Sequence, residues 1–212
     1  MPHNIKRARG RPREFQQGVV LASARDAFWS RGLAGVSLDQ VSQATGVARP
    51  SLAGAFGDKR TLYLRTIADF TAEMAVAAGH LLTGKGDLRT ELAAFFKAAV
   101  DLYLSGDEPR GCMALCTLPV EAVNDREIRE CLAGVIAATD RIFTDRFRRA
   151  LDQGRLPSDV SAKVRGAMAA ALLHSVAIRA RARASKTSLL AMINGALSVL
   201  CDQPERSITQ SP

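Results

Sequence analysis

Two cysteines four residues apart, Cys112 and Cys116, are the residues whose type and spacing come closest to reactive chemistry. Residues at i and i+4 share one face of a helix, and the apolar segment that begins at Gly111 reads as the start of one. A helix N-terminus can lower the pKa of a thiol, so one interpretation is a redox or electrophile sensor centred on Cys112. We favour the other interpretation, in which both thiols are small buried apolar groups, as free cysteines often are.

Sequence signatures of enzyme chemistry are missing. The chain contains no P-loop, dinucleotide fingerprint or HExxH. His3, His80 and His174 are scattered without metal-ligand spacing, and no His or carboxylate can be assigned beside the cysteines. We therefore expect no enzyme activity, no cofactor and no metal site, and we place His174 in a helix, at a ligand pocket or a dimer face.

Composition and charge narrow the class of protein. Of the 212 residues 47% are hydrophobic and only 5% aromatic, which favours close-packed helices over sheets. The net charge of +8 suits an acidic partner such as DNA, although a merely basic protein would share it. No apolar run is long enough for a membrane span or a signal peptide, so we expect a cytoplasmic protein with reduced cysteines.

The stretch from Ser37 to Lys59 is expected to hold the residues that contact such a partner. Ser37 followed by Gln40 forms a capping box at the start of a short helix. Gly46 ends that helix, as glycine does at a left-handed C-terminal position. A second short helix begins near Arg49, with Pro50 in its first turn, where the missing N–H costs nothing.

The second helix carries Leu52 and Phe56 at i and i+4, so both face inward. Two short helices joined by a tight turn containing glycine make a helix-turn-helix. The second helix is roughly 10 Å long and suits a DNA major groove about 12 Å wide. Before it, the basic segment 1–13 reads as an arm that contacts DNA, with a disordered solubilising tail as the alternative.

This part of the chain resembles the DNA-binding domain of the TetR (tetracycline repressor) family of bacterial transcription regulators. The close resemblance covers roughly Gly10 to Phe70, and the remainder is similar in helical layout. The residues that carry it are Gly10-Arg11-Pro12-Arg13, Phe28-Trp29, Arg31-Gly32, Ser37-Leu38, Gly46-Val47, Phe56 and Lys59.

The chain departs from the family pattern in the second helix, where Ala53-Gly54 replaces a tyrosine and a bulky polar residue. Either Arg49, Ser51 and the arm carry recognition, or Gly54 permits close approach of the backbone to DNA. The DNA-binding residues that we predict are Arg11, Arg13, Ser37, Gln40, Arg49, Pro50, Ser51, Gly54 and Lys59.

Hydrophobic periodicity predicts an all-α protein of about nine helices, an N-terminal three-helix helix-turn-helix head followed by a C-terminal helical bundle. The predicted domains are an arm (1–13), a DNA-binding head (14–57), a ligand-binding and dimerisation domain (58–202) and a tail (203–212). The predicted helices are Glu14–Ser30, Ser37–Thr45, Arg49–Phe56, Asp58–Leu82, Leu88–Leu104, Gly111–Val120 (closing near Pro119), a helix from Asn124 or Asp125 to Gln153, Ser158–Ala184 (capped by Ser158) and Ser185–Cys201.

The last two predicted helices are apolar around most of their circumference, which indicates cover on more than one side. They read as half of an intermolecular four-helix bundle in a two-fold dimer, with a buried hairpin inside one protomer as the alternative. The residues that we predict at the dimer interface are Met168, Leu172, Leu189, Ile193, Leu197 and Leu200.

The resemblance implies a dimeric repressor of a palindromic operator with half-sites about 34–36 Å apart, or a multiple of that. It also implies that a small apolar effector in the C-terminal domain releases the DNA by shifting the fourth helix. The predicted pocket residues are Phe70, Met74, Phe95, Cys112, Met113, Cys116, Ile136, Phe143 and His174. The alternatives are a thiol-sensing repressor and a DNA-binding protein without an effector.

Overall fold

The computed structural model describes residues 14–201, and within this range all regular structure is α-helical, which confirms the predicted fold class. None of these helices combines the length and hydropathy needed to span a bilayer. The helices are α1 (Glu14–Arg31), α2 (Leu38–Thr45), α3 (Arg49–Phe56), α4 (Lys59–Leu81), α5 (Leu88–Tyr103), α6 (Met113–Glu121), α7 (Arg126–Asp152), α8 (Ala162–Arg181) and α9 (Lys186–Cys201).

Several helix ends differ from the prediction: α6 begins at Met113 and not Gly111, α8 ends at Arg181 and not Ala184, and two further differences concern a cap and a proline. Ser161, not Ser158, is the N-cap of α8, and its hydroxyl accepts a hydrogen bond from the Val164 amide at 3.3 Å. α6 does not close at Pro119 but runs on to Glu121. Pro119 lies in the last turn of this short helix, so its missing N–H removes a single hydrogen bond and the helix continues.

The chain divides into two compact units, the first ending at Thr66 and the second beginning at Ile67. The division falls inside α4, so one continuous helix contributes to both units.

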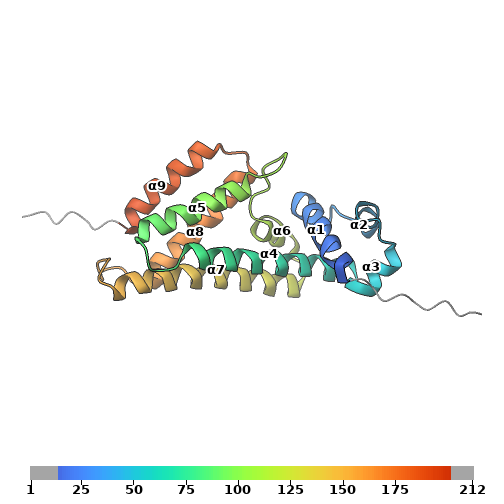
Figure 1. Cartoon of the computed structure of the whole chain (residues 1–212), viewed down its shortest axis with the longest axis horizontal. Helices are drawn as coiled ribbons and strands as arrows, with labels where there is room; N and C mark the ends of the chain where they lie inside the picture. Colours follow the sequence, from blue (N-terminus) through green and yellow to red (C-terminus); the bar gives the residue numbers. More distant parts are fainter. Residues whose placement is uncertain (1–13, 202–212) are drawn as a thin grey trace, which may run out of the picture. The chain divides into compact units, whose positions relative to one another are not determined.

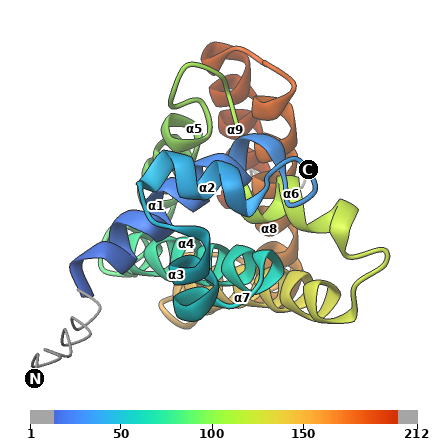
Figure 2. The same cartoon turned by 90° about the vertical axis from the view of Figure 1, so that its right-hand side faces the viewer.

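In the first unit α2 packs against α1, and α3 packs against α2 (Figures 1 and 2). Phe28 of α1 and Tyr63 of α4 are fully buried and meet edge to face, with ring centroids 5.3 Å apart. Val41 of α2 and both Leu52 and Phe56 of α3 complete this core. The inward direction predicted for Leu52 and Phe56 from their spacing is the observed one.

In the second unit α7 packs along α8, while α5 lies beside α8 and α9 (Figure 1). The helices α7 and α8 lie close together at Gly166, where an added Cβ would come within 2.7 Å of the Thr144 backbone nitrogen. C-terminal to this point α8 presents the fully buried residues Ala169, Ala170 and Ala177. The small side chains of α8 therefore serve close helix packing.

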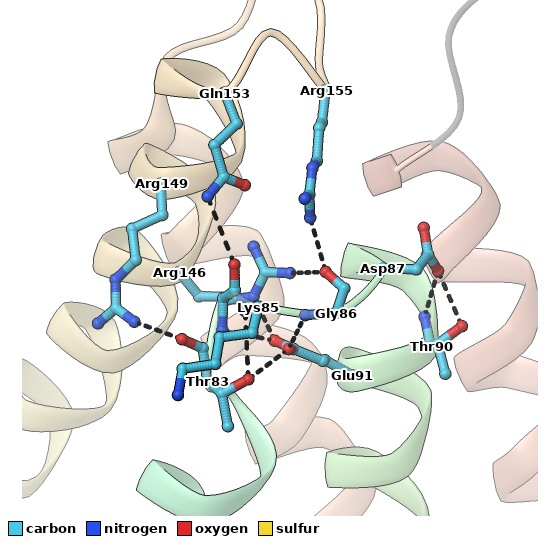
Figure 3. Close-up of polar contacts among 11 residues, drawn as sticks. Thr83, Lys85, Gly86, Asp87, Thr90, Glu91, Arg146, Arg149, Gln153 and Arg155 are labelled. Atoms are coloured by element: carbon cyan, nitrogen blue, oxygen red, sulfur yellow. Dashed lines mark hydrogen bonds and ion pairs between the residues drawn. The ribbon is translucent and has the colours of Figure 1, made fainter.

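The loop between α4 and α5 is held by a buried carboxylate, that of Glu91 (Figure 3). It accepts hydrogen bonds from the backbone amides of Gly84 (3.0 Å) and Gly86 (2.9 Å) and from the Thr83 hydroxyl (2.7 Å). It also forms an ion pair with Arg146 of α7 at 2.7 Å, and the Arg146 side chain is only 1% exposed.

The last turns of α7 and the residues that follow donate to the carbonyls of the same loop (Figure 3). Arg149 donates to Thr83 at 3.1 Å, Gln153 to Gly84 at 3.4 Å, and Arg155 to Gly86 at 2.7 Å. We call this set the loop clamp; its members are Thr83, Gly84, Gly86, Glu91, Arg146, Arg149, Gln153 and Arg155. It ties the end of α4 and the start of α5 to the end of α7.

The loop clamp also sets the charge state of Glu91. Burial acts to raise the pKa of the carboxyl, but the hydrogen bonds from Gly84, Thr83, Gly86 and Arg146 outweigh it and lower the pKa to about 2. Glu91 is therefore ionised in the folded protein across the physiological range.

We expect Glu91→Gln to lower the free energy of unfolding by about 3 kcal/mol at pH 7, because it leaves the buried Arg146 without its counter-charge. The folded-state pKa lies below the ordinary value of 4.5, so this stabilisation is present above pH 4.5 and is lost as the pH falls toward 2. Urea unfolding of both proteins between pH 7 and pH 3 checks this.

The matched control is Glu130→Gln, because Glu130 pairs with Arg126 at 2.8 Å but is 62% exposed. We expect it to change the free energy of unfolding by less than about 0.5 kcal/mol. Similar losses in the two variants, or a difference that does not shrink in acid, would contradict the stabilising role of the loop clamp.

Candidate functional site

The first candidate site begins at the capped N-terminus of α2. The Ser37 hydroxyl accepts the Gln40 amide at 3.2 Å, and the Gln40 side chain accepts the Ser37 amide at 2.9 Å. This is the predicted capping box. Both residues are exposed, so their remaining donors point to solvent at a helix N-terminus, where the backbone favours anions.

The turn between α2 and α3 is fixed by backbone geometry. Gly46 has a φ of 66°, the left-handed conformation that glycine adopts without a steric penalty. The Ser42 hydroxyl donates to the Val47 carbonyl at 2.7 Å across the turn. The angle between the two helices is therefore locked from within the turn.

The outer face of α3 is unusually smooth. Leu52 and Phe56 are buried, and the exposed positions are Arg49, Pro50, Ser51, Ala53 and Gly54. Nothing lies within 4 Å of a Cβ built on Gly54. This face can bring its backbone close to a partner surface, with Arg49 as its single charged side chain.

Arg49 pairs with Asp39 in the first turn of α2, with Nη1–Oδ2 and Nη1–Oδ1 distances of 3.2 and 3.3 Å. Both side chains are more than 60% exposed, so the pair contributes little stability and can open easily. Sequence analysis missed Asp39 because no periodicity relates residues ten apart across a turn. Its carboxylate presets the position of the guanidinium and neutralises it when no anion is bound.

Lys59 and Arg65 of α4 bind backbone carbonyls inside the first unit. Lys59 Nζ donates to the Leu33 carbonyl at 2.9 Å, so at least one of its three donors serves the fold and not a phosphate. Arg65 donates to the Ala55 carbonyl at the end of α3 at 3.1 Å. The predicted arm residues Arg11 and Arg13 lie outside the described residues.

The second candidate site is a cavity of about 330 Å³ in the second unit. Helices α4, α5, α6, α7 and α8 contribute to its wall, which is almost entirely apolar. The lining residues are Phe70, Thr71, Met74, Ala75, Ala77, Ala78, Leu81, Phe95, Ala98, Ala99, Leu102, Tyr103, Cys112, Ala114, Leu115, Val135, Ala138, Thr139, Ile142, Phe143 and Leu173. Its size lies at the lower end of the range for small-molecule sites.

Five of the predicted pocket residues line this cavity: Phe70, Met74, Phe95, Cys112 and Phe143. The other four do not. Ile136 and His174 directly follow the lining residues Val135 and Leu173, so each is turned about 100° away around its helix. Met113, between the lining residues Cys112 and Ala114, is fully buried outside the cavity wall. Cys116 instead directs its sulfur to the Ala177 carbonyl at 3.8 Å.

The small residues of the wall, among them Ala75, Ala78, Ala98 and Ala99, were not predicted. Their signal was available, since Thr71, Ala75 and Ala78 continue the helical spacing of Phe70 and Met74 along α4. Alanine on such a stripe is ambiguous, however, because the same spacing serves close helix packing.

The structure agrees with the favoured interpretation of Cys112 as a buried apolar group, and not with the alternative of a thiol with a lowered pKa. Cys112 is the N-cap of α6, as a helix-dipole effect would require, but its side chain is buried. Burial dominates over the backbone hydrogen bonds of the helix start and raises the pKa of the thiol to about 11. Burial also raises the pKa of the Cys116 thiol. Neither thiol has the thiolate character of a reactive cysteine.

Four of the six predicted interface residues lie in the core of the protomer itself. Leu189, Ile193, Leu197 and Leu200 of α9 are at most 3% exposed, because α9 turns this face toward α5 and α8. For these residues the buried hairpin was the better interpretation. Met168 is 48% exposed and Leu172 is half-buried, so only the two predicted α8 residues remain accessible.

An exposed apolar stripe instead follows the outer face of α8. Val164, Met168 and Ile178 are 50%, 48% and 60% exposed, and Ala171 continues the helical spacing between them. On α9 the exposed Val199 follows the half-buried Met192 at i+7.

His174 of α8 lies near Asp140 of α7. Burial lowers the pKa of the His174 imidazole, and the charge of Asp140 opposes this effect. Among the described residues no group of three or more His, Cys, Asp or Glu side chains could hold a metal ion.

Comparison with known proteins agrees with this geometry. The family model described as bacterial regulatory proteins, tetR family, matches residues 20–66, which include α2, the turn and α3. The HTH-type transcriptional repressor ComR of Escherichia coli (strain K12) is 24% identical over 187 residues, which cover 88% of this chain and 89% of ComR.

Two solved structures share the fold over most of the chain. A cysteine mutant of the TetR family transcriptional regulator CifR, complexed with 26-base-pair double-strand operator DNA, superposes with a TM-score of 0.80 at 28% identity, covering 88% of this chain and 98% of CifR. The reduced form of E. coli NemR gives a TM-score of 0.75 over 88% of this chain and 95% of NemR. At 14% identity NemR supports the fold alone.

We expect Gly54→Ala to raise the free energy of unfolding by about 0.5–1 kcal/mol, because the added methyl meets open space and alanine is the better helix former. The same methyl should weaken binding of α3 to duplex DNA, because it holds the backbone away from the groove. Urea unfolding and a DNA titration on the same preparation measure the two effects.

Gly134→Ala in α7 is the matched control, since Gly134 is also exposed inside a helix with nothing within 4 Å of its Cβ position. It should stabilise the fold similarly and leave DNA binding unchanged. If Gly54→Ala leaves DNA affinity intact, close backbone approach at Gly54 is excluded and side chains carry recognition.

Proposed function

The chain belongs to the TetR family of DNA-binding transcription regulators, and from this premise we propose that it is a dimeric repressor whose operator is released by a small apolar effector. The single observation that carries the proposal is the capped α2, the locked turn and the exposed, smooth α3 in one unit. The family model matches this unit. The helix α4 begins in this unit, and its later residues line an apolar cavity.

On the DNA side, α3 is proposed as the recognition helix. Arg49 and Ser51 would reach base edges, and Pro50 and Gly54 would allow close approach of the backbone. The exposed Ser37 and Gln40 at the N-terminus of α2, together with Lys59, would contact phosphates. Arg11 and Arg13, in the proposed arm of residues 1–13, would add phosphate or minor-groove contacts. The name of ComR and the operator complex of CifR support a repressor on an operator.

A second copy of the chain is proposed to cover the exposed stripe on α8 and Val199 on α9. Exposed apolar groups at Val164, Met168 and Ile178 on one helix face are a continuous surface that water solvates poorly. A two-fold dimer would pair this face with itself and present two copies of α3 to the two half-sites of a palindrome.

The effector is proposed to act through α4, which supplies seven of the lining residues from Phe70 to Leu81. The loop clamp holds the C-terminal end of this helix. A ligand that expands the cavity would therefore move the N-terminal part of α4, since the C-terminal end is held. This N-terminal part belongs to the first unit. The ligand shifts the equilibrium only by its preference for the arrangement that does not bind DNA.

We expect Arg49→Ala to weaken specific DNA binding by roughly ten- to a hundred-fold, because it removes a charged contact and leaves the Asp39 carboxylate facing the DNA. A mobility-shift titration on the promoter region of the chain's own gene, repeated at several salt concentrations, checks this. The logarithm of the affinity should fall linearly with the logarithm of salt concentration.

Arg148→Ala is the control. Arg148 is 59% exposed and pairs with Asp145 at 2.7 Å, so its removal causes the same charge change in the second unit. It should leave affinity within about two-fold of wild type, and equal losses in both variants would mean that net charge, not α3, drives binding.

We expect Met168→Glu to weaken dimerisation at least about ten-fold, because a two-fold interface would bury two carboxylates without partners. Light scattering over a concentration series measures the dimer fraction. Val76→Glu on α4 places the same charge on an exposed valine (63%) away from α8 and should not change it. Equal behaviour of the two variants would place the dimer interface elsewhere.

A further inference from the structure

The wall of the cavity carries no charge. Among the described residues that line it there is no Asp, Glu, Lys, Arg or His, and the polar side chains are Thr71, Thr139, Tyr103 and Cys112. A ligand inside this cavity therefore meets its hydrogen-bonding partners at four positions at most.

Two of these four side chains, Thr71 and Thr139, already donate their hydroxyl protons in hydrogen bonds within the protein. The Thr71 hydroxyl donates to the Ala68 carbonyl at 3.0 Å, and the Thr139 hydroxyl donates to the Val135 carbonyl at 2.9 Å. Both bonds lie within the residue's own helix, so neither hydroxyl has a proton left for a ligand.

Tyr103 and Cys112 both line the cavity and are 5% and 7% exposed. Burial raises the pKa of both the phenol and the thiol, so both stay protonated at physiological pH. A thiol sulfur is only a weak acceptor, so the neighbouring thiol does not replace a ligand oxygen as the partner of the phenol proton.

The backbone fixes this pair in place. The Tyr103 carbonyl, at the end of α5, accepts the amides of Arg110 and Gly111, both at 3.1 Å. Gly111 has a φ of 67°, and a Cβ there would collide with the Ala177 carbonyl of α8. The segment that presents Cys112 is therefore held between α5 and α8, and the donor is preorganised.

We propose that Tyr103 and Cys112 form the polar pole of the cavity and select an uncharged, largely apolar ligand with one hydrogen-bond acceptor, such as a ketone, ester or ether oxygen. Tyr103 is the specificity-determining donor. The inference rests on the proposed effector function and specifies the class of effector. Because a cavity of about 150 Å³ holds benzene, 330 Å³ corresponds to a ligand of about two aromatic rings.

The same wall rejects ions. A carboxylate or an ammonium group inside it would lose its water without gaining a counter-charge, which strongly disfavours binding. A pure hydrocarbon of equal size would enter, but it would offer no acceptor to the Tyr103 hydroxyl.

Three naphthalenes with equal numbers of non-hydrogen atoms test the proposal: 2-acetylnaphthalene, 2-isopropylnaphthalene and 2-naphthoate. Calorimetric titration of the full chain should give ketone binding about ten-fold tighter than hydrocarbon binding, the effect expected for one hydrogen bond. The naphthoate should bind at least a hundred-fold more weakly than the ketone.

Tyr103→Phe should bring the ketone to within about three-fold of the hydrocarbon while leaving hydrocarbon binding unchanged. Thr71→Val removes a hydroxyl that is already used and should keep the wild-type ratio. Binding of the hydrocarbon by Tyr103→Phe shows that the variant is folded, and the unfolding temperature gives an independent check.

The proposal is overturned if the naphthoate binds as well as the ketone, if Tyr103→Phe leaves the ketone preference intact, or if none of the three ligands binds. A mobility-shift assay of the protein–DNA complex with and without the ketone tests the proposed effector role separately from ligand selectivity. The expected affinity ratios without DNA release would sustain the polar pole and refute the effector role. DNA binding without any ligand binding would refute the polar pole alone.

Discussion

The buried ion pair between Glu91 and Arg146 is the interaction on which the second unit depends. A charge with almost no access to water needs compensation, and the Glu91 carboxylate receives it from Arg146 together with the Gly84 and Gly86 amides and the Thr83 hydroxyl. The pair joins the start of α5 to the last turns of α7, and the amides of the intervening loop add the end of α4. These three helices also provide most of the cavity wall. A cavity of about 330 Å³ removes packing contacts between these helices, so the loop clamp at their ends adds to direct contacts such as that of Phe95 with Phe143.

Burial in the second unit also decides what its cysteines can do. The close approach at Gly111 presses the start of α6 against α8, which removes Cys112 from water and raises its pKa to about 11. The favourable position at a helix start is outweighed, because desolvation of a thiolate costs more than the helix end returns. The same desolvation keeps Tyr103 protonated, so one physical cause makes the thiol unreactive and the phenol a hydrogen-bond donor.

In the first unit local interactions fix α2 and α3, and the exposed face of α3 carries few large side chains. Its capping box, left-handed glycine and turn hydrogen bond fix the relation of α2 to α3 through interactions that are all local. Because this framework is rigid, α3 does not need long side chains to define its direction, and its outer face consists of small residues and Arg49. Opening the exposed Arg49–Asp39 pair costs little free energy, so the Arg49 guanidinium is available to an anionic partner. When no such partner is bound, Asp39 pairs with the guanidinium.

The sequence by itself determined the all-α fold, the helix-turn-helix and most helix ends, because capping, glycine conformation and 3.6-residue periodicity depend on neighbours along the chain. Five pocket residues followed from the same periodicity. What only the tertiary structure decided were contacts between distant segments: the pairing of Glu91 with Arg146, the burial of Cys112 and the direction of α9. A helix that is apolar nearly all round gives no internal sign of which face the protomer covers. Leu189, Ile193 and Leu197 became core residues because α5 and α8 lie against them, and the pKa of Cys112 rose because the folded protein buries its side chain.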